Sequence, residues 1–202
     1  MKLYYSPGVC SLAPHIALLE AGLAFEPKLT NIRTHQLADG TDFYTINPKG
    51  SVPVLEFDDG SRLTEGPAIV QWIADQAPDK RLAPPAGTRE RYRLMEWLNF
   101  ITSELHKGYS PLFNPALSAE VKAVFADKLV QRYRHADEQL ARTPYLLGED
   151  FTVADAYLFT VTRWSVPLKL DLSAYSHLAA FMQRVGPRPA VQQALQAEGL
   201  KA

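Results

Sequence analysis

Hydrophobic positions in the first eighty residues alternate between the spacing of strands and the spacing of helices. Apolar runs that end at turn residues predict strands, and apolar positions three or four residues apart predict helices. The strands are expected over residues 2–5, 25–29, 52–57 and 61–63, and the helices over residues 12–23 and 67–75. The last two strands flank the turn sequence Asp58-Asp59-Gly60, which is typical of a hairpin. This part of the chain therefore predicts an α/β unit.

Beyond residue 87 the apolar spacing is helical, and no convincing strand is predicted. Helices are expected over residues 88–107, 119–142, 153–168, 176–185 and 188–197. Before them, the stretch APDKRLAPPAG combines Pro and Gly in the manner of a linker. We therefore predict an α/β domain over residues 1–77, a linker over residues 78–87 and an all-helical domain over residues 88–202.

The composition is that of a soluble globular protein, with 47% hydrophobic and 21% charged residues in a chain of 202. The net charge of −1 argues against a nucleic-acid or anionic-membrane partner, which usually needs a basic surplus. A single cysteine excludes an internal disulfide. The first residues lack the apolar core of a secretion signal, and no run of about 18 apolar residues occurs. We expect a soluble, cytoplasmic protein.

The one cysteine, Cys10, lies in the stretch SPGVCSLAPH, where the first strand ends and the first helix begins. The N–H groups at a helix start favour negative charge and lower the pKa of a thiol, which would make Cys10 reactive. A buried, inert cysteine is the alternative. Redox proteins often use C-x-x-C, but Ala13 stands at the second position, so a reactive Cys10 needs an external small-molecule thiol. Ser11 is expected to cap the helix, and the hydroxyls of Tyr5 and Ser11 rank below the thiol as reactive groups.

Two further turns are candidate ligand sites. Glu65 and Gly66 precede a helix, where main-chain N–H groups can receive a carboxylate and Glu65 can pair with a ligand's ammonium group. The alternative is a solvated acid that only complements the helix dipole. Val52-Pro53 opens a strand, and the residues alone favour an ordinary trans proline at a sheet edge.

A polar stripe runs along the predicted helix over residues 88–107. At about 100° per residue, Asn99, Ser103 and His106 fall on one side, opposite the apolar positions. The stripe is either a solvated face or one wall of a polar cleft in which His106 exchanges a hydrogen bond with a bound thiol.

The sequence Phe151-Thr152-Val153-Ala154-Asp155 predicts an N-capping box, with Thr152 as the cap and Asp155 three residues later. We assign this motif to folding and expect Asp155→Ala to lower the free energy of unfolding by about 1 kcal/mol or somewhat more.

Taken in order, these pieces resemble one family over essentially the whole chain, the bacterial beta-class glutathione transferases. The stretches that carry the resemblance are MKLYYSPGVCSLAPHIALLEAGL, NPKGSVPVL, LTEGPAIVQWIAD, ERYRLMEWLNFITSELHKGYSPLF and FTVADAYLF. The resemblance implies a thioredoxin-like N-terminal domain, an all-helical C-terminal domain, a homodimer and no metal. It also implies that the Val52-Pro53 bond is cis.

The resemblance implies a site for each part of glutathione. The catalytic residues would be Cys10 and His106. The glutathione-binding residues would be Cys10, His35, Val52, Pro53, Glu65, Gly66, Asn99, Ser103, Glu104 and His106. Val52 would pair through its main chain with the cysteinyl part, and Ser103 and Glu104 would line the site across the dimer. His35 departs from the family, in which a lysine commonly meets the glycyl carboxylate.

The implied function is glutathione S-transferase activity on a hydrophobic electrophile, together with thiol–disulfide exchange through Cys10. The same resemblance leaves reductive dehalogenation and peroxide reduction open. A non-catalytic glutathione-binding protein of the same fold is the alternative, and loss of Cys10 or His106 would have favoured it. Both residues are present.

Overall fold

The computed structural model of the protein describes residues 1–201, which form two compact units. The first unit holds residues 1–83 together with the C-terminal stretch that begins at residue 187, and the second holds residues 84–186. The boundary at residue 83 lies inside the stretch predicted as a linker. The C-terminal stretch differs from expectation, because we predicted it within the helical domain.

The first unit is built on a mixed five-stranded sheet. Its strands are β1 (Lys2–Tyr5), β2 (Glu26–Asn31), β3 (Gln36–Leu37), β4 (Val54–Glu56) and β5 (Arg62–Thr64). The strand order is β3-β2-β1-β4-β5, with β1 and β2 parallel and the other neighbours antiparallel. The predicted hairpin is confirmed as β4 and β5, while the two-residue β3 carries too short a pattern to be predicted.

Both faces of the sheet are covered. Leu3 of β1 lies opposite Leu55 of β4, and both are fully buried. Successive residues of a strand point to opposite faces, so Tyr4 lies on the other face. There it packs in a buried cluster with Val54 and with Phe43 of the short 3₁₀ helix η1 (Phe43–Thr45). The helices α1 (Leu12–Ala21) and α2 (Gly66–Gln76) correspond to the two predicted helices of this unit, and they pack against each other.

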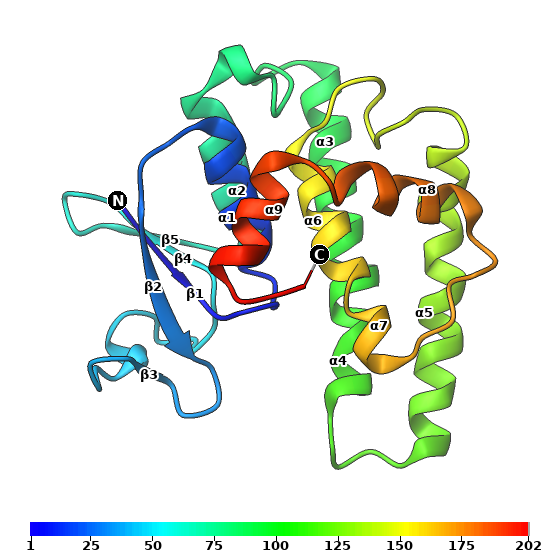
Figure 1. Ribbon diagram of the computed structural model, residues 1–202, viewed down its shortest axis with the longest axis horizontal. Helices are drawn as coiled ribbons and strands as arrows, with labels where there is room; N and C mark the ends of the chain where they lie inside the picture. The colour runs from blue at the N-terminus through cyan, green and yellow to red at the C-terminus, as the bar shows by residue number, and fades with distance from the viewer. Residues whose placement is uncertain (202) are drawn as a thin grey trace. The chain divides into compact units, whose positions relative to one another are not determined.

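The C-terminal stretch belongs to the first unit because α9 (Pro189–Ala197) packs along α1, as Figure 1 shows. The apolar face of α9 is buried there, and Arg188 forms an ion pair with Glu20 of α1. The next residue after α9, Glu198, is also buried. One of its carboxylate oxygens lies 2.8 Å from His15 Nδ1, and the other accepts the main-chain N–H of Gly8 at 2.8 Å. An amphipathic pattern reveals an apolar face but not the partner that covers it.

We expect Glu198→Gln to lower the free energy of unfolding by about 1.5 kcal/mol. The amide offers one oxygen where the two carboxylate oxygens serve the N–H of Gly8 and Nδ1 of His15, so one of these is left facing an NH₂ group. Denaturant unfolding measures the change. Glu26→Gln is the control, since Glu26 pairs with Lys28 on the exposed surface and such pairs contribute little. Equal effects of the two substitutions would contradict the anchoring role of Glu198.

The regular secondary structure of the second unit consists of helices. Its helices are α3 (Arg89–Phe100), the π-helical η3 (Ile101–His106), α4 (Lys107–Phe113), α5 (Ala119–Leu140), α6 (Val153–Thr162), α7 (Ser165–Leu168) and α8 (Ser176–Val185). A 3₁₀ turn, η2 (Pro78–Lys80), precedes them in the first unit. The predicted helix over residues 88–107 continues to residue 113. The one predicted over 153–168 is divided, and Pro167 lacks the N–H that an unbroken helix would need there.

Every residue of α6 is buried, so this helix forms the centre of the second unit. Its start is the predicted capping box, which is confirmed, with the side chain of Asp155 accepting the N–H of Thr152 at 2.8 Å. Among residues 1–201, no helix is long and apolar enough to cross a membrane.

Candidate active site

Cys10 lies in the loop between β1 and α1 and is partly exposed. Its Sγ is 3.2 Å from the main-chain oxygen of Val52. A carbonyl oxygen only accepts hydrogen bonds, so this contact uses the protonated thiol. The expectation that Ser11 caps α1 is wrong. Its hydroxyl instead accepts the N–H of Ser6 and donates to the carbonyl of Ser6, both at 3.1 Å, which closes the loop that carries Cys10.

The Val52-Pro53 bond is cis, as the resemblance implied and as the residues alone did not favour. Both residues are buried, immediately before β4. The turn that leads into them is held by Asn47, whose amide group donates to the carbonyl of Ser51 at 2.6 Å and accepts the N–H of Lys49. The structure therefore fixes the main chain of Val52 next to the thiol of Cys10.

Glu65 is the residue before α2, and its φ of +68° is uncommon for a residue other than glycine. The helix begins at Gly66. Pro67 has no N–H, and those of Ala68 and Ile69 donate to the carbonyl of Glu65 at 3.0 Å, so the N–H of Gly66 is the first-turn donor left without an intrahelical acceptor. The exposed carboxylate of Glu65 pairs with Lys49, whose ammonium group also donates to the hydroxyl of Thr64 at 2.8 Å. The carboxylate of Glu65, the ammonium group of Lys49 and the N–H of Gly66 thus lie close together in the first unit. Lys49 was missed in the sequence, because a lone lysine in a turn carries no distinguishing pattern.

His35 also has a positive φ, of +53°, and its ring packs on Tyr44 with the ring centres 4.5 Å apart. The ring also lies against Gly50, where an added Cβ would come within 3.1 Å of it. His35 Nδ1 is buried and has no hydrogen-bond partner within residues 1–201. A buried polar atom without a partner is unusual in a folded protein.

In the second unit, the predicted polar stripe follows the continuous helical stretch from α3 through η3. Asn99 and Ser103 are exposed, and Glu104 forms an ion pair with Arg132 of α5 at 2.8 Å. The stripe was drawn at 100° per residue, but η3 is π-helical and winds more loosely than that. His106, its last residue, points instead into a buried aromatic group.

His106 Nδ1 lies 2.6 Å from the hydroxyl oxygen of Tyr157 on α6. The imidazole also meets the ring of Trp164 edge-on, with centres 4.9 Å apart. Burial lowers the pKa of His106 to about 4, and the charge of Lys107 acts in the same direction. The ring is therefore neutral at physiological pH. Tyr157 and Trp164 were missed because aromatic residues in an apolar stretch are typical of a core.

The structure brings Cys10, Val52 and Pro53 together in the first unit. In the second unit it gives His106 a polar partner, Tyr157. No group of three His, Cys, Asp or Glu side chains suited to a metal ion occurs among the described residues.

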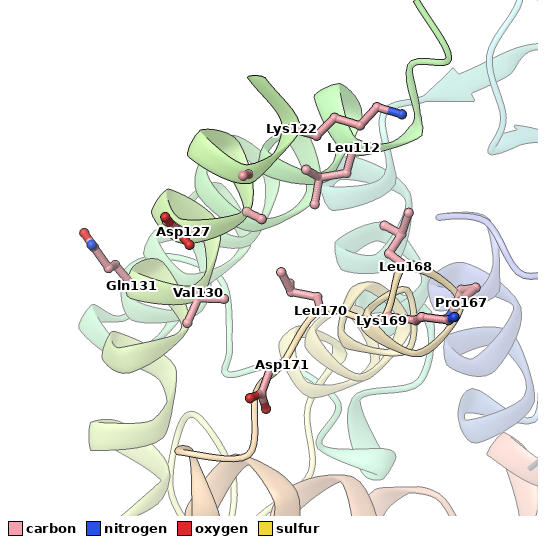
Figure 2. A pocket seen from close by; sticks show the side chains of 12 residues that line it. Leu112, Lys122, Asp127, Val130, Gln131, Pro167, Leu168, Lys169, Leu170 and Asp171 are labelled. Atoms are coloured by element: carbon pink, nitrogen blue, oxygen red, sulfur yellow. The ribbon is translucent and has the colours of Figure 1, made fainter. Parts of the chain in front are cut away.

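A cavity of about 770 Å³ lies within the second unit, between α4, α5, the end of α7 and the segment that follows it. Figure 2 shows apolar side chains such as Val130 and Leu170 along its walls, with Lys122 and Asp171 toward its ends. No predicted site residue lines this cavity.

Comparison with known proteins gives matches along the chain. The profile described as "Glutathione S-transferase, N-terminal domain" matches residues 8–76, and that of the "Glutathione S-transferase, C-terminal domain" matches residues 100–189. The chain is 48% identical over 201 residues to glutathione S-transferase GstA of Escherichia coli O157:H7, with both chains fully covered.

Two solved structures are similar in both fold and sequence. The ternary complex of BphK, a bacterial GST, superposes with a TM-score of 0.97 at 56% identity and covers 99% of this chain and 100% of its own. The bacterial beta-class glutathione S-transferase of Sphingomonas chungbukensis superposes with a TM-score of 0.96 at 47% identity, with both chains covered completely.

Proposed function

The chain belongs to the glutathione S-transferase family, in its bacterial beta class, and from this premise we propose that Cys10 takes part directly in the chemistry of glutathione. Family membership makes the protein a transferase that acts on glutathione. The finer proposal is that the enzyme both conjugates glutathione to hydrophobic electrophiles and exchanges disulfides through Cys10. The observation that carries it is the thiol of Cys10, held 3.2 Å from the main chain of Val52.

The first unit offers groups that match the ends of the tripeptide. Glutathione carries an ammonium and a carboxylate group at its γ-glutamyl end, and Glu65 and the N–H of Gly66 complement these charges. The main chain of Val52 would pair with the cysteinyl residue as one more strand would. His35 would donate to the glycyl carboxylate, and Pro53 shapes the turn.

The family likeness assigns further roles toward glutathione to residues of the second unit. His106 would donate a hydrogen bond to the sulfur, Asn99 would contribute from the same helical stretch, and Ser103 and Glu104 would complete the site of a partner subunit in a homodimer. In conjugation, the glutathione thiol loses its proton, and the thiolate attacks an electrophilic carbon and expels the leaving group. The proposed partners are thus glutathione, a hydrophobic electrophile and a second copy of this chain, and the proposed location is the cytoplasm.

In exchange, the thiolate of Cys10 attacks the glutathione sulfur of a mixed disulfide and releases the other thiolate. A second glutathione thiolate then attacks the Cys10–glutathione disulfide, which yields glutathione disulfide and restores the Cys10 thiolate. The net reaction converts one mixed disulfide and one glutathione into one thiol and one glutathione disulfide. No oxidant from outside is needed.

The test compares binding with turnover. The wild-type protein is expected to be retained on immobilised glutathione, to conjugate 1-chloro-2,4-dinitrobenzene and to reduce a mixed disulfide of glutathione. Retention without either reaction would favour the non-catalytic binding protein. Sedimentation at several concentrations tests the homodimer separately.

A further inference from the structure

The hydrogen bond between His106 and Tyr157 joins two elements that pack together, because α6 lies against both α3 and η3. Tyr157 is only 3% exposed. Its hydroxyl oxygen is 2.6 Å from His106 Nδ1, which makes a short hydrogen bond. Which of the two atoms donates depends on the tautomer of the ring, and the chemistry of the two groups decides it.

The acidity of the two groups gives the direction. A phenol O–H is a stronger hydrogen-bond donor than the N–H of a neutral imidazole, and an imidazole lone pair is a better acceptor than a phenol oxygen. The strongest form of the contact is Tyr157 O–H donating to His106 Nδ1.

The direction of this hydrogen bond decides whether Nε2 of His106 is a hydrogen-bond donor or an acceptor. A neutral imidazole has one N–H and one lone pair, and the partner of one nitrogen fixes the state of the other. We propose that Tyr157 is a positioning residue, whose hydroxyl holds the imidazole proton of His106 on Nε2. This inference rests on the proposed function, in which His106 faces the glutathione sulfur.

An Nε2–H group can stabilise a thiolate through a charge-assisted hydrogen bond, but it cannot accept the proton of the thiol. His106 would then act as a donor that holds the ionised sulfur, not as its general base. The burial that keeps the ring neutral suits this role, since a neutral donor keeps its proton when the sulfur carries the charge.

The surroundings hold both rings in place. Trp164 meets His106 edge-on, and Tyr109 meets Trp164 edge-on in turn, with centres 5.4 Å apart. Tyr157 lies two residues after Asp155, whose buried side chain fixes the start of α6. The capping box, which we assigned to folding alone, thus lies beside the group that orients His106.

Nitrogen NMR of the protein labelled with ¹⁵N-histidine reads the tautomer directly, without substrate. The wild type is expected to show His106 protonated on Nε2, with the signal assigned by its absence from His106→Gln. In Tyr157→Phe, the Nδ1-protonated form should gain population. A wild-type ring protonated on Nδ1 would overturn the inference, whether or not Tyr157→Phe folds.

Kinetics give the second readout. Tyr157→Phe is expected to lower kcat for conjugation about tenfold, with a smaller change in KM for glutathione. The matched control is Tyr175→Phe, which removes the hydroxyl that donates to the carbonyl of Val130 at 2.7 Å in the same unit. This control should leave kcat near the wild-type value, and an equal loss in both variants would contradict the positioning role.

His106→Gln distinguishes a hydrogen-bond donor from a general base at this position. Glutamine keeps an N–H group near the position of Nε2 but has no basic lone pair. It is therefore expected to retain several-fold more activity than His106→Ala, and equal activities would contradict the donor role. A wild type without glutathione turnover would instead reject the proposed function, while the NMR result would still report the tautomer.

Discussion

Replacing Cys10 by alanine is expected to stop disulfide exchange while conjugation continues at a reduced rate. Exchange through a covalent intermediate depends on the attacking thiolate, so its loss should lower the exchange rate by about a thousandfold or more, to that of the uncatalysed reaction. Conjugation uses the thiolate of glutathione itself, which the remaining donors still hold. Steady-state assays of both reactions on the same preparations measure the difference.

Cys10→Ser separates the role of Cys10 as a nucleophile from its hydrogen bond to the carbonyl of Val52. Serine keeps a hydroxyl that can donate to the carbonyl of Val52 but is a poor nucleophile without an adjacent base. It should resemble Cys10→Ala in exchange and the wild type more closely in conjugation. Because the chain has one cysteine, intact-mass analysis of the wild type after exposure to glutathione disulfide should show a single glutathione adduct. Exchange that persists in Cys10→Ala would reject the nucleophilic role.

The hydrogen bond from Cys10 to Val52 affects how readily the thiol ionises. The thiol donates to a carbonyl oxygen that a thiolate cannot approach favourably, so ionisation of Cys10 has to break the contact. The main chain of Val52 is also the proposed partner of the cysteinyl residue of glutathione. Binding of the tripeptide at this carbonyl would therefore compete with the resting position of the thiol and favour its release.

Much of the fold follows from periodicity alone. The alternation of strands and helices up to residue 76, and the helical spacing beyond residue 87, both predict elements that the structure confirms. Two features have no local signal. The π-helical turn of η3 keeps Ile101 and Leu105 buried four residues apart, as an α-helix would, so apolar spacing does not reveal it. The docking of α9 on α1 depends on a partner almost the whole chain away.

The proposed site shows the same division. Cys10, Glu65 and His106 could be proposed from the sequence because each is a reactive or charged residue at a turn or on a polar stripe. Tyr157 is one aromatic residue within a helix that is buried on all sides, and nothing in its spacing separates it from the core. The positive φ angles at His35 and Glu65 also went unpredicted, since neither residue type favours that conformation.

The second large effect is expected at Asp155. Its fully buried carboxylate accepts three hydrogen bonds, from the N–H groups of Leu146 and Thr152 and from the hydroxyl of Thr152, at 2.8 to 2.9 Å. Asp155→Ala leaves these buried donors without a partner. We expect it to lower the free energy of unfolding by about 3 kcal/mol, more than the capping motif alone suggested, and to lower Tm by about 10 °C.

Thr88→Ala is the matched control, because Thr88 caps α3 and accepts the N–H of Arg91 at 3.2 Å in a partly exposed position. It should cost about 1 kcal/mol. Denaturant unfolding of both variants at pH 5 makes the comparison. If the two substitutions lower stability equally, Asp155 acts only as an ordinary helix cap, and its bond to Leu146 contributes nothing.

The same carboxyl should give stability a dependence on pH that Asp155→Asn lacks. Burial raises the pKa of Asp155 from its ordinary value of 3.8 to about 6, although the three donors act in the opposite direction. A group whose pKa is raised on folding stabilises the folded chain fully below its unfolded pKa, and this contribution is lost as the pH rises through the folded pKa. The free energy of unfolding of the wild type, relative to Asp155→Asn, should therefore fall between about pH 4 and pH 6, with a slope of at most about 1.4 kcal/mol per pH unit, and level off above.

Urea unfolding at half-unit steps of pH measures this difference. A difference that rises over the same range would mean that the three donors outweigh burial and hold Asp155 ionised.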